Sequence, residues 1–105
     1  SEVTQVSSPV VIENGKHVFH LNVIRISERN ELMEFLTNNG VGVAIHYPKA
    51  LPFLPCYSER NFKESDFPVA AKVQNEILSL PMYAELTKNE INTVVNLIKE
   101  FYSKK

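Results

Sequence analysis

The sequence predicts an α+β fold: a small two-layer domain in which a small mixed sheet carries helices on one face. Two observations predict this class. The 105 residues are 44% hydrophobic and 22% charged, which suits one folded domain with a modest core. Apolar residues follow strand-like and helix-like spacings in turn, in the order strand, helix, strand, loop, helix, short strand, helix.

The first predicted strand follows a lead-in segment. Residues 1–16 end at the turn-forming pair Asn14-Gly15 and include a candidate edge strand near residues 10–12. The domain proper is expected to span 17–105. Residues 17–26, HVFHLNVIRI, are rich in β-branched and aromatic residues at both alternating positions, which is typical of a central strand with both faces covered.

A helix and a second strand come next. The helix is predicted by an apolar stripe, with Ser27 as its N-cap and Asn39-Gly40 at its end. The stripe consists of Leu32, Phe35 and Leu36. Apolar residues 41–45 predict the second strand, which a right-handed crossover would place parallel to the first. Residues 78–82 would then lie between or beside these two strands in the antiparallel direction.

The second half predicts a long surface excursion and two helices. Residues 48–67 contain prolines and many polar residues, with one helical turn expected around 51–57. Asp66 and Pro68 are expected to begin the next helix as cap and first-turn residue. The last helix has the clearest signal, because Thr87 and Glu90 form a capping box before an apolar 3.6-residue period that runs to residue 101.

Composition argues against several classes of partner. The net charge is -1 and the basic residues are scattered, so nucleic acid is not expected to bind. No apolar run approaches the roughly 20 residues of a bilayer span, so we expect a cytoplasmic protein with no membrane partner. Cys56 is the only cysteine, which excludes an internal disulfide, and its neighbours supply no base, so it receives no role.

The sequence offers no convincing metal site or catalytic centre. His17 and His20 stand three apart on a predicted strand and would point to opposite faces, so they could not both reach one ion. With His46 and Cys56 they are the candidate soft ligands, and no CxxC or HExxH pattern supplies the rest of a site. Neither a GxSxG elbow nor the phosphate-binding patterns GxxxxGK and GxGxxG occur. No residue is therefore assigned to catalysis, to a metal or to a cofactor.

His46 and Tyr47 are the candidate ligand-binding residues, because they end the second strand just before Pro48. One interpretation is structural: His46 caps the strand and Tyr47 rests its ring on the edge of the core. The other is functional: both side chains enter a cleft and bind hydroxyl groups of a polar ligand, while Pro48 stiffens the loop. The pattern alone leaves both open.

A succession of motifs resembles a known family. HVFHLNVIRI, NELMEFL, NNGVGVAIHYPKALPFLPCY and DFPVAAKVQNEILSLPMYAELTKNEI occur in this order from about His17 to the C-terminus. Together they resemble the C-terminal part of the DegT/DnrJ/EryC1/StrS family of pyridoxal-phosphate (PLP) sugar aminotransferases. Their succession is more specific than any one of them.

The resemblance implies the small C-terminal domain of a fold-type-I aminotransferase, which packs on a large PLP domain missing here. Such enzymes transfer an amino group, usually from glutamate, to a nucleotide-linked keto sugar for lipopolysaccharide, other surface polysaccharides or antibiotics. It also implies that His46 donates to a sugar oxygen and that Tyr47 supplies a hydroxyl or ring contact.

The chain departs from the family in one respect. No lysine lies in a Schiff-base motif, so we expect the chain alone to hold no PLP and to be inactive. The alternative is a standalone binding or interaction module without chemistry. For such a module, the face that would pack on the large domain is expected to remain as an exposed apolar patch, and the purified chain is expected to form weak dimers or larger species.

Overall fold

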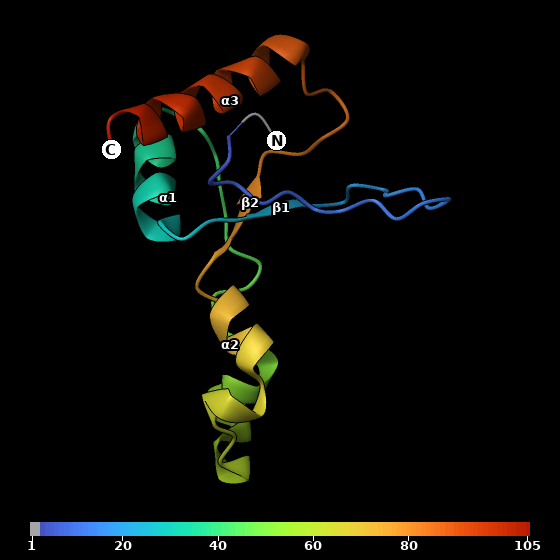
Figure 1. Cartoon of the computed structure of the whole chain (residues 1–105), viewed down its shortest axis with the longest axis vertical. Coiled ribbons are helices and arrows are strands. Elements are labelled where there is room, and N and C mark those ends of the chain that lie inside the picture. The colour runs from blue at the N-terminus through green and yellow to red at the C-terminus, as the bar shows by residue number, and fades with distance from the viewer. Residues whose placement is uncertain (1–2) are drawn as a thin grey trace.

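The computed structural model describes residues 3–105 and confirms the α+β class (Figure 1). The strands are β1 (Asn22–Arg25) and β2 (Ile77–Leu80). The helices are α1 (Arg29–Asn38), α2 (Pro68–Val73) and α3 (Lys88–Ser103). Short 3₁₀ helices at Leu51–Phe53, Pro55–Arg60 and Glu64–Asp66 occupy the excursion of residues 48–67.

The sheet is antiparallel rather than mixed. β1 pairs with β2 from Asn22 opposite Leu80 to Arg25 opposite Ile77. On the other side of β2, Ala44 forms a single antiparallel bridge with Ser79, so residues 41–45 make one bridge instead of a full strand. The prediction that residues 78–82 insert antiparallel is therefore confirmed for β2. Because β1 and residues 41–45 are both antiparallel to β2, they run in the same direction, as the crossover predicted, with β2 between them.

The core lies where α1, α3 and the sheet meet. Its buried side chains come from both layers and form one cluster: Ile24, Ile26, Leu32, Leu36, Leu78, Ile98 and Phe101. Leu32, Leu36 and Leu78 are fully buried. Two of them are in the apolar stripe predicted for the first helix, which confirms that the helical period identifies its core face.

The N-terminal region differs most from prediction. β1 begins at Asn22, and residues 8–20 leave the body as a projecting arm (Figure 1). Val10, Ile12 and Val18 are 86%, 74% and 85% exposed, so neither the edge strand at 10–12 nor the covered strand from residue 17 is present. β1 is instead bordered by Ser7, whose N–H and carbonyl exchange hydrogen bonds of 3.0 and 2.9 Å with Arg25. Within residues 3–105, these apolar side chains of the arm are not packed against the core.

The helix caps were predicted with mixed success. Thr87 caps α3, since Glu90 N–H donates to its hydroxyl (3.2 Å) and its own N–H donates to the Glu90 carboxylate (3.4 Å). Ser27 is not the cap of α1: Glu28 occupies that position, and its carboxylate accepts a hydrogen bond from Tyr102 instead of capping the helix.

The expected cap of α2 is also wrong. Asp66 accepts a 2.8 Å hydrogen bond from Lys63 N–H and so closes the preceding 3₁₀ turn, while Phe67 stands at the start of α2. The helix is also shorter than its apolar pattern, because Ile77 already belongs to β2. No helix within residues 3–105 is long and apolar enough to cross a membrane.

Candidate functional site

His46 is anchored to the middle strand through Ser79. The Ala44 and Ser79 backbones exchange hydrogen bonds of 3.2 and 2.7 Å, which brings residues 44–46 alongside β2. The His46 Nδ1 atom then lies 2.7 Å from the Ser79 hydroxyl. Ser79 is only 4% exposed, whereas His46 is half-buried. The ring is therefore held by an atom that solvent barely reaches, and its Nε2 atom is the nitrogen left to meet a ligand.

Tyr47 points outward beside this ring. Its side chain is 71% exposed, and its ring lies edge-on to His46 with centroids 5.5 Å apart. The two rings are therefore neighbours with different exposures: one is anchored and the other is open to solvent. The structural interpretation, in which Tyr47 packs on the core edge, does not describe a ring this exposed.

A surface hollow of about 520 Å³, which we call the tyrosine hollow, opens beside Tyr47. Its walls are mostly apolar and come from the loop after Tyr47, from α2 and from the start of β2: Tyr47, Lys49, Ala50, Leu51, Leu54, Ala70, Val73, Gln74 and Ile77. A volume of 300–1,000 Å³ is usual for small-molecule sites. The arrangement can accept the apolar face of a ring-shaped ligand beside the Tyr47 hydroxyl. His46 does not line the hollow itself but lies against the Tyr47 ring.

Two long-range contacts fix the far wall of the tyrosine hollow. The Gln74 side-chain carbonyl accepts a 2.8 Å hydrogen bond from Ala50 N–H and so holds the loop against the end of α2. Arg29 is 7% exposed, and its guanidinium donates to the carbonyls of Gln74 (3.2 Å) and Ile77 (3.0 Å). This arginine therefore ties α1 to the wall of the hollow.

Sequence reasoning gave no role to Ser79 or Arg29. Ser79 lies within the family-like motif DFPVAAKVQNEILSLPMYAELTKNEI, but its contact with His46 spans 33 positions, which no local pattern reveals. Arg29 carried a usable signal, because a cation in the first turn opposes the helix dipole and needs another reason to be there.

The other chemistry-bearing residues lie apart from this site. His17 accepts a 2.8 Å hydrogen bond from Phe19 N–H within the arm, and both it and His20 precede β1, so the expected strand histidines are instead arm residues. Cys56 is an exposed free thiol. No group of three His, Cys, Asp or Glu side chains suited to a metal occurs in residues 3–105.

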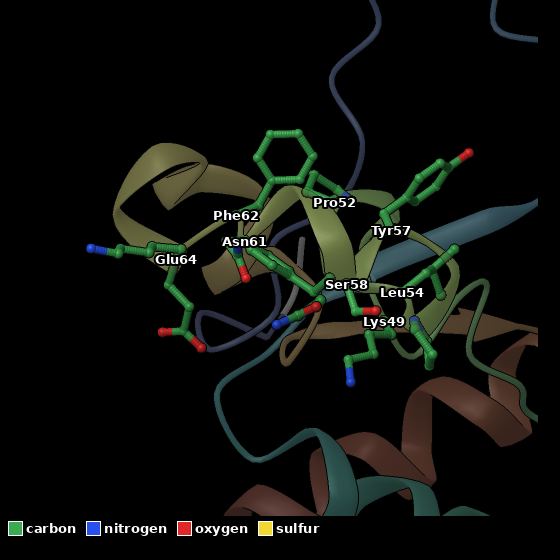
Figure 2. A pocket seen from close by; sticks show the side chains of 12 residues that line it. Lys49, Pro52, Leu54, Tyr57, Ser58, Asn61, Phe62 and Glu64 are labelled. Atoms are coloured by element: carbon green, nitrogen blue, oxygen red, sulfur yellow. The ribbon is translucent and has the colours of Figure 1, made fainter.

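A second, larger hollow adjoins the first (Figure 2). It lies within the excursion, and we call it the excursion hollow. Lys49, Leu54 and Gln74 line both hollows, so the two share a wall.

Known proteins match both the sequence and the fold. The profile of the DegT/DnrJ/EryC1/StrS aminotransferase family matches residues 1–99. Over 97 residues the chain is 38% identical to a "Pleiotropic regulatory protein" of Geobacillus stearothermophilus, covering 92% of this chain and 26% of that protein. Over 93 residues it is 29% identical to dTDP-3-amino-3,6-dideoxy-alpha-D-galactopyranose transaminase of Aneurinibacillus thermoaerophilus, covering 89% and 25%.

A solved structure has the same fold as this chain. The crystal structure of S. venezuelae DesV in complex with a ketimine intermediate superposes with a TM-score of 0.87 at 27% identity, covering 92% of this chain and 26% of DesV. The chain thus spans about a quarter of the length of the relatives it matches. The match of the family profile over nearly all of these residues shows that the chain belongs to the DegT/DnrJ/EryC1/StrS aminotransferase family.

Proposed function

We propose that this chain is the C-terminal small domain of a PLP-dependent aminotransferase. The reaction moves an amino group, usually from glutamate, to a nucleotide-linked keto sugar that enters lipopolysaccharide, another surface polysaccharide or an antibiotic. One relative acts on a dTDP-linked amino sugar, which supports this substrate class. A cytoplasmic location, without nucleic acid or membrane partners, remains part of the same prediction.

His46 and Tyr47 are the proposed sugar contacts. The observation that carries this proposal is the anchored His46 ring beside the exposed Tyr47 ring at the edge of an apolar hollow. An imidazole nitrogen and a phenol can each donate to or accept from a sugar hydroxyl. The apolar walls suit the C–H face of a sugar ring. The role of this domain is therefore to orient the sugar, with no proton transfer assigned to either residue.

An NMR titration of the isotope-labelled chain with a nucleotide-linked sugar tests these contacts. We expect shifts at His46, at Tyr47 and at the apolar wall, and weaker binding in Tyr47→Phe and His46→Ala. Tyr83→Phe is the matched control, because Tyr83 is also exposed but lines neither hollow. Shifts that avoid both residues, or binding that both variants leave unchanged, would contradict the proposed contacts.

PLP is proposed to lie in the missing large domain. The cofactor supplies the electron-accepting ring that transamination requires, and it is held through a lysine whose amine is usually desolvated. Every lysine in residues 3–105 is exposed, so none fits that role. Borohydride reduction of the chain with PLP, followed by mass spectrometry, should give no stoichiometric adduct, and such an adduct on one lysine would contradict this part of the proposal.

A further inference from the structure

Gln74 places a side-chain amide in a wall of the tyrosine hollow that is otherwise mostly apolar. It is half-buried at the end of α2, in the wall that the two hollows share. Among the described residues that line the tyrosine hollow, the other side chains with hydrogen-bonding groups are those of Tyr47 and Lys49. Gln74 is therefore the uncharged amide that a ligand in this hollow meets.

The backbone of Gln74 is held at both of its polar groups. Its N–H donates to the Ala70 carbonyl at 3.1 Å, which closes the end of α2. Its carbonyl accepts a hydrogen bond of 3.2 Å from the guanidinium of Arg29, a cation that is only 7% exposed and also donates to Ile77. The side chain of Gln74 therefore extends from a fixed point of the backbone.

The orientation of the side-chain amide follows from its contact with Ala50. The backbone N–H of Ala50 is a donor, so the Gln74 atom 2.8 Å from it is the carbonyl oxygen Oε1. The amide nitrogen Nε2, which carries two hydrogens, makes no hydrogen bond within residues 3–105. Gln74 thus has its acceptor occupied by the protein and its donor available.

We propose that Gln74 is a specificity-determining residue of the tyrosine hollow, whose side-chain NH₂ group donates a hydrogen bond to an oxygen atom of the bound sugar. This inference rests on the proposed function and extends it, because it adds a polar contact from the α2 wall to those of His46 and Tyr47. A ligand that covered this NH₂ group with a C–H group would remove its water and leave a donor unpaired, which weakens binding. Gln74 therefore selects a sugar that carries an oxygen at this wall.

Titration of the isotope-labelled chain with a nucleotide-linked sugar tests the assignment, because the side-chain NH₂ group of Gln74 has its own NMR resonances. We expect these resonances to shift together with those of His46 and Tyr47. Gln74→Glu keeps an oxygen for the Ala50 N–H but has no NH₂ group. The Ala50 amide should therefore stay protected from hydrogen exchange, while the affinity falls about two- to tenfold, the effect of losing one neutral hydrogen bond. Gln74→Met removes both groups, so exchange at Ala50 should also accelerate.

Asn75→Asp is the matched control for the charge that Gln74→Glu introduces. Asn75 is the next residue, is exposed and lines neither hollow, so this variant should bind the sugar like the unmodified chain. Salt gives a second control, because repulsion between like charges weakens as the ionic strength rises. A loss of affinity in Gln74→Glu that persists at high salt is therefore the loss of the donor.

The outcomes separate this inference from the proposed function. If the sugar shifts His46 and Tyr47 but not the Gln74 NH₂ resonances, or if Gln74→Glu binds it like the unmodified chain, the inference is wrong and the sugar contacts stand. A loss of affinity that high salt abolishes would also overturn the inference. Absence of shifts at all three residues would overturn the proposed contacts and this inference together. Native resonances of the core in each variant confirm that it is folded.

Discussion

Replacing Ser79 with alanine should loosen the His46 ring at a small cost in stability. The change removes the hydroxyl that lies 2.7 Å from Nδ1, at a position only 4% exposed. A hydrogen bond contributes about 0.5–1.5 kcal/mol net, and a buried polar atom left without a partner costs about 1–3 kcal/mol. Because the His46 ring is half-buried and can turn toward water, we expect the free energy of unfolding to fall by about 1 kcal/mol.

Urea denaturation of a double-mutant cycle measures this contact directly. Ser79→Ala, His46→Ala and the double variant should give a coupling energy of at least about 0.5 kcal/mol, as expected for residues in contact. Ser65→Ala is the matched control: Ser65 is exposed in the 3₁₀ turn Glu64–Asp66, and the change should stay within about 0.5 kcal/mol.

Imidazole nitrogen shifts provide a second, structural measurement. In the unmodified chain the Nδ1 resonance should report a hydrogen-bonded ring, and in Ser79→Ala it should move toward the value of a solvated histidine. Additive free energies together with unchanged nitrogen shifts would show that Ser79 does not hold the ring, and the argument for an anchored ligand contact would fail with it.

Four further expectations concern the core, the wall of the tyrosine hollow, a titration and the arm. Leu78→Ala, at a fully buried position, should lower the free energy of unfolding by about 2–5 kcal/mol in urea; a loss below 1 kcal/mol would contradict its place in the core. Arg29→Met keeps an apolar stem but leaves two carbonyls without their donor, so we expect a loss of about 1–3 kcal/mol, with exposed Arg60→Met as a neutral control. Burial and the nearby Glu28 carboxylate raise the pKa of Tyr102 from 10.0 to about 12. Its contribution to stability is therefore complete below pH 10 and is lost as the pH rises to 12, and Tyr102→Phe should flatten the dependence of the unfolding free energy on pH in that window. Ile12→Ser should reduce weak self-association in sedimentation velocity, because Ile12 is 74% exposed on the arm; a strictly monomeric unmodified chain at high concentration would contradict an associating arm.

Local pattern predicted the helices well and the sheet less well. The capping box of Thr87 and Glu90 and the apolar stripe of α1 depend on neighbours three or four residues away, so the sequence displays them directly. Strand pairing depends on distant residues: Ala44 meets Ser79, and Ser7 meets Arg25. The apolar run 17–26 shows that composition alone does not predict where a strand begins. Its first residues have a strand-like pattern, yet Val18 is 85% exposed.

The candidate site was predictable in part for the same reason. His46 and Tyr47 could be singled out, because Pro48 ends a short apolar segment immediately after them. Their different environments could not be predicted, because the burial of Ser79 and its hydrogen bond with His46 arise only when β2 packs beside residues 44–46. The contacts by which Arg29 supports the wall of the tyrosine hollow could not be predicted either, since its two carbonyl partners lie 45 and 48 residues away.

The distribution of burial separates the site from the core of the domain. No residue from 37 to 70 is fully buried, although this stretch supplies His46, Tyr47 and most of both hollows. It is joined to the body by the hydrogen bonds of Ser79 with His46 and of Gln74 with Ala50, and by the partly buried side chains of residues 41–45 that pack against the core. Exposed substitutions away from such contacts usually change stability by no more than about 0.5 kcal/mol. A change at the exposed Tyr47 should therefore alter ligand binding without unfolding the domain, so its effect on binding can be interpreted directly.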